Sequence, residues 1–359
     1  MRPVRFTTVL AVAALLGVSA TPAGACTTSL LQHGDEVVVA KSYDFPVGDG
    51  LIIVNPRGVA KHAMGGGAYG SPLSWVSRFG SVTFNQYGRE MPAGGMNEAG
   101  LVVEVMWLDE TRYEVPDARP ALPDLQWIQY QLDTRAGVAE LLAHAGEQRV
   151  SSQTARVHFL ACDRSAVCAA IEFVGGAMVV TTGAAMPWKT LTNNTYADSC
   201  AFVARRGEGG GRGSAQGSGS LERFDRAAAL SRLAVERDAG SPGLVDDAFA
   251  LLDSVSQGPG SVWNIVYDPN RLVVRYRTHA QPRIKTIELA AFDFACDGGA
   301  LSLDVDADRW GRVATSFGPY TLGANRRLLQ RLARSNAVPL PPGAVDYLAR
   351  FPESFHCVP

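Results

Sequence analysis

Strand-like and helix-like segments come in groups along this chain, and the grouping limits the folds open to it. Runs of β-branched and aliphatic residues predict a first group of strands at 27–31, 37–41, 51–56, 81–85 and 101–108. A helical period predicts two helices within 123–146. Strands are then expected at 156–161, 168–174 and 177–182, helices at 221–236 and 244–255, and further strands at 261–268, 271–278 and 283–290. This order predicts a layered α+β fold with antiparallel sheets and argues against a parallel sheet of single βα units.

The first 25 residues have the pattern of a secretory signal peptide. Two arginines precede the apolar run 9–18, and Ala23-Gly24-Ala25 forms a small-residue cleavage site. The run is shorter than the roughly 20 residues of a membrane-spanning helix. We therefore expect residues 1–25 to be removed and the mature protein, 26–359, to act in the periplasm or outside the cell, with no membrane span.

Composition favours a single folded domain over 26–359. The chain is 47% hydrophobic and 19% charged, which allows a large core. Its formal net charge of -2 does not indicate a nucleic acid or an anionic membrane as partner. Residues 207–220 are rich in Gly and Ser and predict a flexible surface loop. The alternative is a lid near a functional site, because Arg223 follows at once.

Cys26 becomes the N-terminal residue if cleavage occurs as predicted. A free α-amine has an ordinary pKa of about 7.7–8.0 and a thiol one of about 8.5, so the amine can accept the thiol proton near neutral pH. One residue then supplies both nucleophile and base. None of the six histidines lies in a motif that pairs it with Cys26. Two alternatives remain: acylation of Cys26 in a lipoprotein, and an ordinary disulfide cysteine.

Five cysteines remain when Cys26 is set aside, so at least one of them has no partner within the chain. Cys162 and Cys168 flank a predicted hairpin end, where a disulfide is sterically plausible. A bond between Cys296 and Cys357 would tie down the C-terminal tail. The sequence leaves the pairing open.

Several short motifs together resemble the choloylglycine hydrolase family, which includes conjugated bile salt hydrolases and penicillin V acylases. They are CTTSLL at 26–31, VVVAKSYDF at 37–45, GGMNEAGL at 94–101, LTNN at 191–194 and ERFDR at 222–226. The resemblance implies a four-layer αββα sandwich of the N-terminal nucleophile hydrolases. It also implies hydrolysis of linear, non-peptide amides by a thiol nucleophile.

By this resemblance, four residues are candidates for catalysis. Cys26 matches the nucleophile, and Asp44 matches an aspartate that orients its amine and thiol. Asn193 matches an asparagine whose side-chain NH2 stabilises the oxyanion, a kind of contribution worth about 2.7–4 kcal/mol elsewhere. Arg223 matches an arginine near the nucleophile, at a helix start. The plain structural alternatives are an exposed turn for Asp44, a turn for Asn193 and a solvated helix charge for Arg223.

Two positions depart from the bile salt hydrolase pattern, and we assign both to substrate binding. Lys41 stands where the family usually has arginine, which keeps the charge but loses the planar fork. Trp107 replaces an asparagine, so a backbone N–H would have to supply one oxyanion donor and the indole would add an aromatic wall. This departure is similar to the Gram-negative, penicillin V acylase-like branch. The alternative is that Trp107 belongs to the core.

No metal or cofactor is expected. The sequence has no HExxH or paired CxxC motif, and the spacing of Cys162 and Cys168 is poor for zinc.

The expected substrates are small acyl amides, penicillin V-type amides or N-acyl homoserine lactones first and conjugated bile salts second. The family resemblance also points to a homotetramer. The alternative of a different class is a lipidated, non-catalytic surface protein on the same fold.

Overall fold

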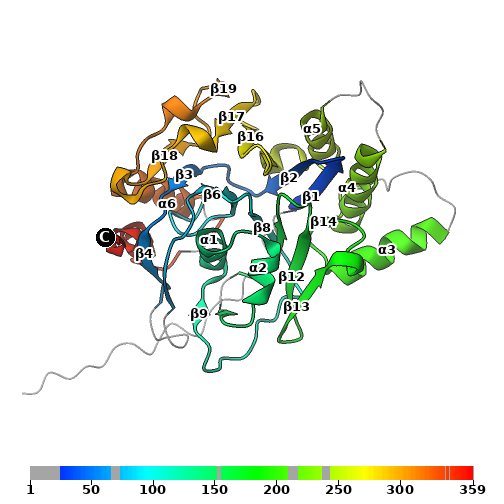
Figure 1. Cartoon of the computed structure of the whole chain (residues 1–359), viewed down its shortest axis with the longest axis horizontal. Coiled ribbons are helices and arrows are strands. Elements are labelled where there is room, and N and C mark those ends of the chain that lie inside the picture. Colours follow the sequence, from blue (N-terminus) through cyan, green and yellow to red (C-terminus); the bar gives the residue numbers. More distant parts are fainter. Residues whose placement is uncertain are drawn as a thin grey trace, which may run out of the picture.

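The computed structural model describes residues 25–65, 73–151, 155–208, 217–236, 243–335, 337–338 and 340–358. The predicted signal segment, apart from Ala25, and residues 209–216 of the predicted Gly/Ser loop lie outside these ranges. The described residues form helix, sheet, sheet and helix layers (Figure 1). The predicted α+β, four-layer αββα sandwich is confirmed.

Two large sheets make up the inner layers. In the described residues, the first sheet has the order β14 (Thr190–Leu191), β1 (Thr27–His33), β2 (Glu36–Asp44), β15 (Ser261–Asp268), β16 (Val273–Thr278), β17 (Lys285–Glu288) and β19 (Gly311–Arg312). The second has the order β13 (Ala177–Thr182), β12 (Cys168–Val174), β11 (Val157–Cys162), β8 (Val102–Trp107), β7 (Gly94–Asn97), β6 (Ser81–Asn85), β3 (Leu51–Asn55), β18 (Leu301–Asp304) and β20 (Gly318–Pro319). Most pairings are antiparallel, as expected; the exception within these sheets is the short contact of β17 with β19.

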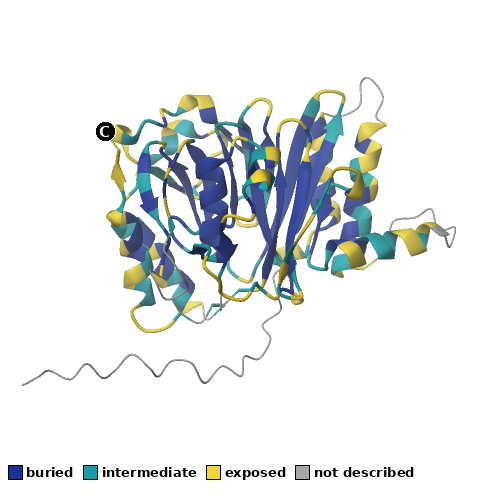
Figure 2. Cartoon of the chain, turned by 60° about the horizontal axis from the view of Figure 1, so that its bottom comes forward, coloured by how far each residue is buried: buried dark blue, intermediate teal, exposed yellow. Residues whose placement is uncertain are grey.

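Helices cover the outer faces of both sheets. Helices α4 (Ser220–Val235) and α5 (Leu244–Ser254) pack on β1 and β2, whereas α1 (Asp124–Thr134) packs on β7 and β8. The remaining α-helices of the described chain are α2 (Val138–Ala143), α3 (Tyr196–Glu208), α6 (Leu322–Arg334) and α7 (Ala344–Arg350). The strands at the centre of the molecule are buried on both faces (Figure 2).

The pattern of β1 and β2 explains why two layers pack on them. Leu30, Val37 and Val39 face the core between the sheets, and the alternate residues Leu31 and Val38 face α4 and α5. Successive side chains of a strand point to opposite faces. Both faces are apolar here, so the sheet must be covered on both sides.

Helix α1 differs from the amphipathic helix that the sequence indicates, because all of its residues are buried. A small sheet consists of β21 (His356–Cys357), β4 (Val59–His62) and β5 (Ser74–Val76), and its side chains bond α1. Elsewhere, β9 (Ala121–Leu122) and β10 (Arg149–Val150) form a short parallel pair. Trp75 Nε1 donates to Asp133 Oδ2 at 2.8 Å, and Lys61 Nζ lies 3.0 Å from the same oxygen. The buried carboxylate of Asp133 on α1 is therefore satisfied by protein partners.

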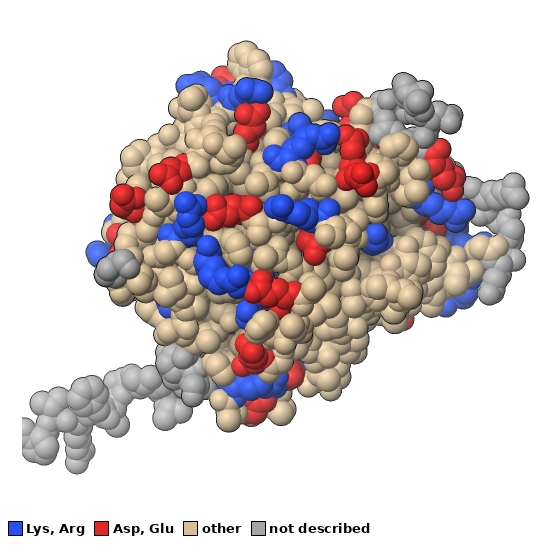
Figure 3. Space-filling model, viewed as in Figure 1, with Lys and Arg blue, Asp and Glu red and all other residues tan. Residues whose placement is uncertain are grey.

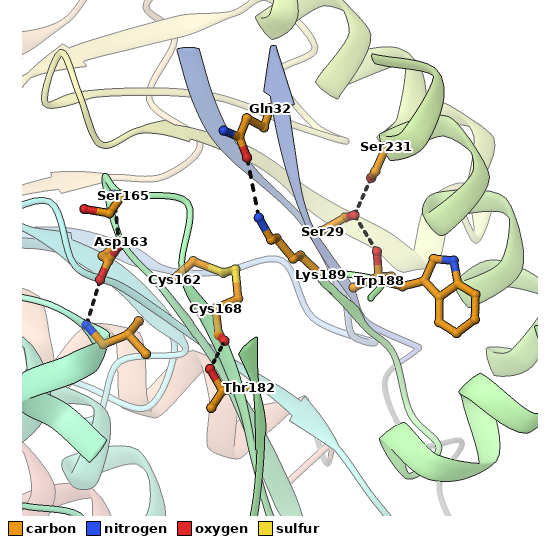
Figure 4. The surroundings of a disulfide bond; sticks show 12 residues. Ser29, Gln32, Cys162, Asp163, Ser165, Cys168, Thr182, Trp188, Lys189 and Ser231 are labelled. Carbon is orange, nitrogen blue, oxygen red and sulfur yellow. Dashed lines mark hydrogen bonds between the residues drawn. A yellow bond between two sulfur atoms is a disulfide. The ribbon is translucent and has the colours of Figure 1, made fainter. Parts of the chain in front are cut away.

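Two disulfides are present among the described residues. Cys162 and Cys168 pair directly across the β11–β12 hairpin, and Thr182 Oγ1 donates to the Cys168 carbonyl (Figure 4). Cys296 bonds Cys357 and holds β21 near the C-terminus. Cys26 and Cys200 are free thiols. These bonds are the two that the cysteine positions made plausible.

The surface in Figure 3 shows acidic and basic side chains interspersed, without a large area of one sign. No helix in the described part of the chain has the length and apolar character needed to cross a membrane.

The Cys296–Cys357 bond should stabilise the fold measurably. It closes a loop with a sequence separation of 61 residues, which restricts the unfolded chain. We expect the double variant Cys296→Ala/Cys357→Ala to lose about 2–4 kcal/mol of unfolding free energy. Urea unfolding without reductant measures this loss, and Cys200→Ala serves as the control because Cys200 is already a free thiol. Equal unfolding midpoints for the double variant and the unsubstituted protein would contradict the prediction.

Candidate active site

The β1–β2 hairpin brings Cys26 and Asp44 together. Thr27 pairs with Ser42 in the antiparallel register, so the residue before β1 meets the end of β2. Cys26 Sγ lies 4.0 Å from the Asp44 carbonyl oxygen, and Cys26 is only 4% exposed. Local strand pairing therefore positions the candidate nucleophile beside the backbone of Asp44.

Asp44 is buried at the end of β2 and does not lie in an exposed turn. Its Oδ1 accepts hydrogen bonds from Ser42 Oγ at 2.6 Å and Ser261 Oγ at 2.5 Å. Its Oδ2 is buried and has no hydrogen-bond partner in the described chain. Burial raises the pKa of Asp44, and the hydrogen bonds from Ser261 and Ser42 oppose that increase. Oδ1 is thus held by two hydrogen bonds, whereas Oδ2 receives none from the described chain.

Arg223 connects the start of β1 to the segment that carries Asn193. Its Nη1 donates to the Cys26 carbonyl oxygen and to Thr27 Oγ1, both at 2.7 Å. Its Nη2 donates to Asn193 Oδ1 at 2.8 Å. Arg223 lies in the first turn of α4 and is 1% exposed, so it is no solvated helix charge. Burial lowers the pKa of Arg223, and the charges of Asp44 and Cys26 raise it.

Asn193 is held in one orientation by three neighbours. Its backbone N–H donates to Ser220 Oγ at 2.8 Å, and its side-chain Nδ2 donates to the Trp107 carbonyl oxygen at 2.9 Å. Because Arg223 donates to Oδ1, the amide nitrogen and oxygen are distinguished by the hydrogen-bond network. The side-chain NH2 therefore lies on the Trp107 side of the residue.

Lys41 is fully buried between the sheets. Its ammonium donates to the Val105 carbonyl oxygen at 2.6 Å and to Met106 Sδ at 3.3 Å, and it lies 3.7 Å from Glu104 Oε2. These three partners hold the Lys41 ammonium group in place. The assignment of Lys41 to substrate binding stays a prediction.

Trp107 ends β8 and is partly exposed while packing on the main core. Its indole N–H donates to Asp109 Oδ1 at 2.7 Å, and its carbonyl accepts from Asn193. The residue thus has a backbone role in holding Asn193 and presents an aromatic ring at the end of the strand. Its role in acyl selectivity stays a prediction.

The charges around Cys26 act on its thiol in opposite directions. Burial raises the pKa of the Cys26 thiol most strongly, and the Asp44 carboxylate raises it further. The positive charges of Lys41 and Arg223 lower it. The net effect is a raised pKa of the Cys26 thiol, so formation of the thiolate requires a base that accepts the proton.

The sequence interpretation missed several residues that support the site. Ser42 and Ser261 hold Asp44, and Glu104 pairs with Lys41. Glu104 carried a usable signal, because it is a lone charge in the apolar run 101–108. Ser261 carried none, since its contact with Asp44 joins positions 217 residues apart.

In the described part of the chain, no group of three or more His, Cys, Asp and Glu side chains could hold a metal ion.

Glu104 should make the stability of the fold depend on pH. Burial raises its pKa from 4.5 to about 7, and the charge of Lys41 opposes the increase. A raised carboxyl pKa means that ionisation costs more in the folded chain than in the unfolded one. This group therefore lowers the unfolding free energy as the pH rises from about 4.5 to about 7, by an amount on the order of 3 kcal/mol at most. We expect the unfolding free energy of Glu104→Gln to fall less than that of the unsubstituted protein as the pH rises through this interval.

Urea unfolding at pH 5 and pH 8 measures that difference. Glu36→Gln is the matched control, because Glu36 is a partly exposed glutamate on β2. The unfolding free energy of Glu36→Gln should change between the two pH values by as much as that of the unsubstituted protein. An unchanged slope in Glu104→Gln would contradict the prediction.

No protein family model matches the chain. A penicillin V acylase from Pectobacterium atrosepticum is 27% identical over 282 residues, covering 67% of this chain and 74% of that protein. The structure of penicillin V acylase from Agrobacterium tumefaciens is similar with a TM-score of 0.72 and 24% identity, over 82% of this chain and 98% of that one.

A variant of conjugated bile acid hydrolase from Clostridium perfringens has a TM-score of 0.66 and 15% identity, over 78% of this chain and 97% of that one. These two solved structures establish the common fold. The chain thus has the N-terminal nucleophile hydrolase fold of these enzymes, and the sequence relative, a penicillin V acylase, supports its resemblance to the choloylglycine hydrolase family.

Proposed function

We propose that the chain is an exported cysteine amidase that hydrolyses penicillin V-type amides or N-acyl homoserine lactones through an acyl-thioester on Cys26. The observation that carries this proposal is the Arg223 bridge, which joins the Cys26 carbonyl to the Asn193 amide. Arg223, which lies 197 positions after Cys26, thereby links that residue to Asn193. The relationship to a penicillin V acylase supports the substrate class.

Cleavage before Cys26 supplies the base. It breaks the peptide bond to Ala25 and leaves an α-amine two bonds from the carbon that bears the thiol. The amine takes the thiol proton, and the sulfur attacks the substrate carbonyl. The buried carboxyl group of Asp44 supports this step, because it is close enough to Cys26 for its charge to act on the thiol and can accept a hydrogen bond from the new ammonium group.

The tetrahedral intermediate then places negative charge on the former carbonyl oxygen. We assign the side-chain NH2 of Asn193 as one donor to this oxyanion, with a backbone N–H near the end of β8 as the other. Collapse of the intermediate breaks the C–N bond, and the ammonium of Cys26 gives its proton to the leaving amine. Water then hydrolyses the thioester, which returns the thiol and releases the acid.

Aromatic side chains near Cys26 favour a flat or aliphatic acyl group. Tyr87 is close enough for the Cys26 charge to raise its pKa, although burial is the larger cause. Phe45 follows Asp44, and its ring meets that of Tyr87 edge-on with centroids 6.2 Å apart. Phe45, Tyr87 and Trp107 are all partly exposed. Rings of this kind offer apolar planes to an acyl chain.

The two disulfides support function outside the cytoplasm. Such bonds persist in oxidising compartments and are rare in the cytosol. With the predicted signal segment 1–25, they favour the periplasm or the external medium. Assembly into a homotetramer stays a prediction.

Cys26→Ser should fold normally but lose turnover by roughly 10³-fold or more, because serine is the weaker nucleophile in the same catalytic unit. An extra residue before Cys26 should be comparably harmful, since it removes the free amine. Release of amine from a panel of acyl amides measures both effects. Full activity of Cys26→Ser, or of the uncleaved precursor, would disprove the mechanism.

Intact mass of the mature protein is the accompanying control. A free N-terminal Cys26 is expected, and a diacylglyceryl adduct would support the lipidated surface protein instead.

Trp107→Ala should weaken binding of short aromatic acyl groups by about 1–3 kcal/mol in the transition state, since it removes an apolar plane. It should affect bulkier bile salts less. The measurement is kcat/KM for penicillin V, an N-acyl homoserine lactone and glycocholate with both proteins. Preference of the unsubstituted enzyme for glycocholate would reverse the substrate ranking. Equal losses for all three substrates together with a lower Tm would assign Trp107 to the core.

A further inference from the structure

A buried histidine and glutamate fasten both ends of the segment that carries Asn193. His158 on β11 places Nε2 2.7 Å from the Thr192 carbonyl oxygen and Nδ1 3.0 Å from Glu172 Oε1. Glu172 on β12 accepts the Tyr196 backbone N–H at 3.0 Å through Oε1 and at 3.2 Å through Oε2. His158 is fully buried and Glu172 is 3% exposed. Two adjacent strands of the second sheet thus hold positions 192 and 196.

The partners of His158 define the role of each ring nitrogen. A carbonyl oxygen only accepts hydrogen bonds, so Nε2 carries a proton and donates to Thr192. Nδ1 forms the second hydrogen bond of the ring, with Glu172 Oε1, and the Tyr196 N–H donates to the same carboxyl group. Both ring nitrogens are therefore held by fixed partners.

His158 acts on Asn193 through a single rigid peptide group. The Thr192 carbonyl and the Asn193 N–H belong to the same peptide bond, whose six atoms lie in a plane. His158 holds the oxygen of that plane, and Ser220 on α4 holds the N–H at 2.8 Å. A strand of the second sheet and helix α4 of the outer layer therefore both hold this peptide plane. Its orientation sets the direction in which the Asn193 side chain leaves the backbone.

We propose that His158, bonded to Glu172 and to the Thr192 carbonyl, is a positioning residue that aligns the Asn193 amide for the oxyanion. The proposal rests on the proposed role of Asn193 and extends it to a residue that does not touch the substrate. A displacement of about 1 Å at a catalytic group can cost on the order of 10²-fold in rate. The pinned peptide plane prevents such a displacement.

The principal test compares His158→Asn with His158→Gln. The shorter Asn side chain keeps a donor in the place of Nδ1, whereas Gln keeps one in the place of Nε2 and can still reach Thr192. We expect His158→Asn to lower kcat by roughly 10–100-fold with KM changed by less than about threefold. His158→Gln should recover part of that loss. His144→Asn is the control, because His144 is a partly buried histidine whose Nδ1 bonds the Glu140 carbonyl in the preceding helix turn.

A double-variant cycle separates positioning from general destabilisation. If His158 acts through Asn193, then His158→Asn should cause little further loss in an Asn193→Ala background, because coupled residues do not add. Additive losses, or full activity of His158→Asn alone, would overturn the proposal. Full activity of Asn193→Ala would overturn it as well.

A readout without turnover keeps this proposal distinct from the proposed function. In protein labelled with ¹⁵N at histidine and asparagine, we expect Nε2 of His158 to carry a proton. The Asn193 side-chain NH2 signal, assigned through Asn193→Ala, should shift in His158→Asn and stay in place in His144→Asn. An Nε2 without a proton or an unmoved Asn193 signal would refute the positioning role even in an active enzyme. Inactivity toward every amide, with both NMR results as expected, would refute the proposed reaction alone.

Discussion

The site depends on the buried guanidinium of Arg223. It is the group that touches the Cys26 carbonyl, Thr27 and Asn193 at once, and it comes from a helix on the outer layer of the fold. A buried charge is costly unless its donors are satisfied, and here at least three polar atoms receive them. The same bonds satisfy a buried carbonyl and a side-chain amide. Loss of the guanidinium would therefore leave unsatisfied groups on both partners.

A second charge links the two sheets. Lys41 extends from β2 to β8, where a carbonyl, a thioether sulfur and Glu104 receive its ammonium. A lysine suits this place because its charge is compact and its stem is apolar, whereas an arginine would bring a planar fork with five donors. Gly94 leaves the room for Glu104, since a Cβ at that position would lie 2.3 Å from the carboxylate. Lys41 is thus matched by an acidic partner in the facing sheet.

Hydrogen bonds from several elements of the fold hold the loop that carries Asn193 in one conformation. The segment between β14 and α3 has little regular structure of its own, yet contacts reach it from β8, β11, β12 and α4. Each contact is a hydrogen bond to a buried polar group, so moving the loop would break several bonds together. A loop held in this way can serve a reaction that needs a fixed donor.

Local patterns in the sequence determined the order of strands and helices, the hairpin that begins at Thr27, and the short motifs that mark Cys26, Asp44, Asn193 and Arg223. These features are readable because periodicity, turn residues and motifs depend on neighbours in the chain. The helices α3, α6 and α7 and the burial of α1 on all sides were not foreseen, since tertiary contacts with distant segments decide them.

The tertiary structure alone decided which groups complete the site. Ser261 reaches Asp44 only because β15 pairs with β2, and His158 reaches Thr192 only because the second sheet places β11 beside that loop. Their sequence separations of 217 and 34 residues leave no local signal. Strand register and layer packing set these contacts, and both follow from the fit of whole faces rather than from any short segment. The candidate residues, Cys26 among them, were therefore legible in the sequence, whereas the alignment of the groups around Cys26 belongs to the fold.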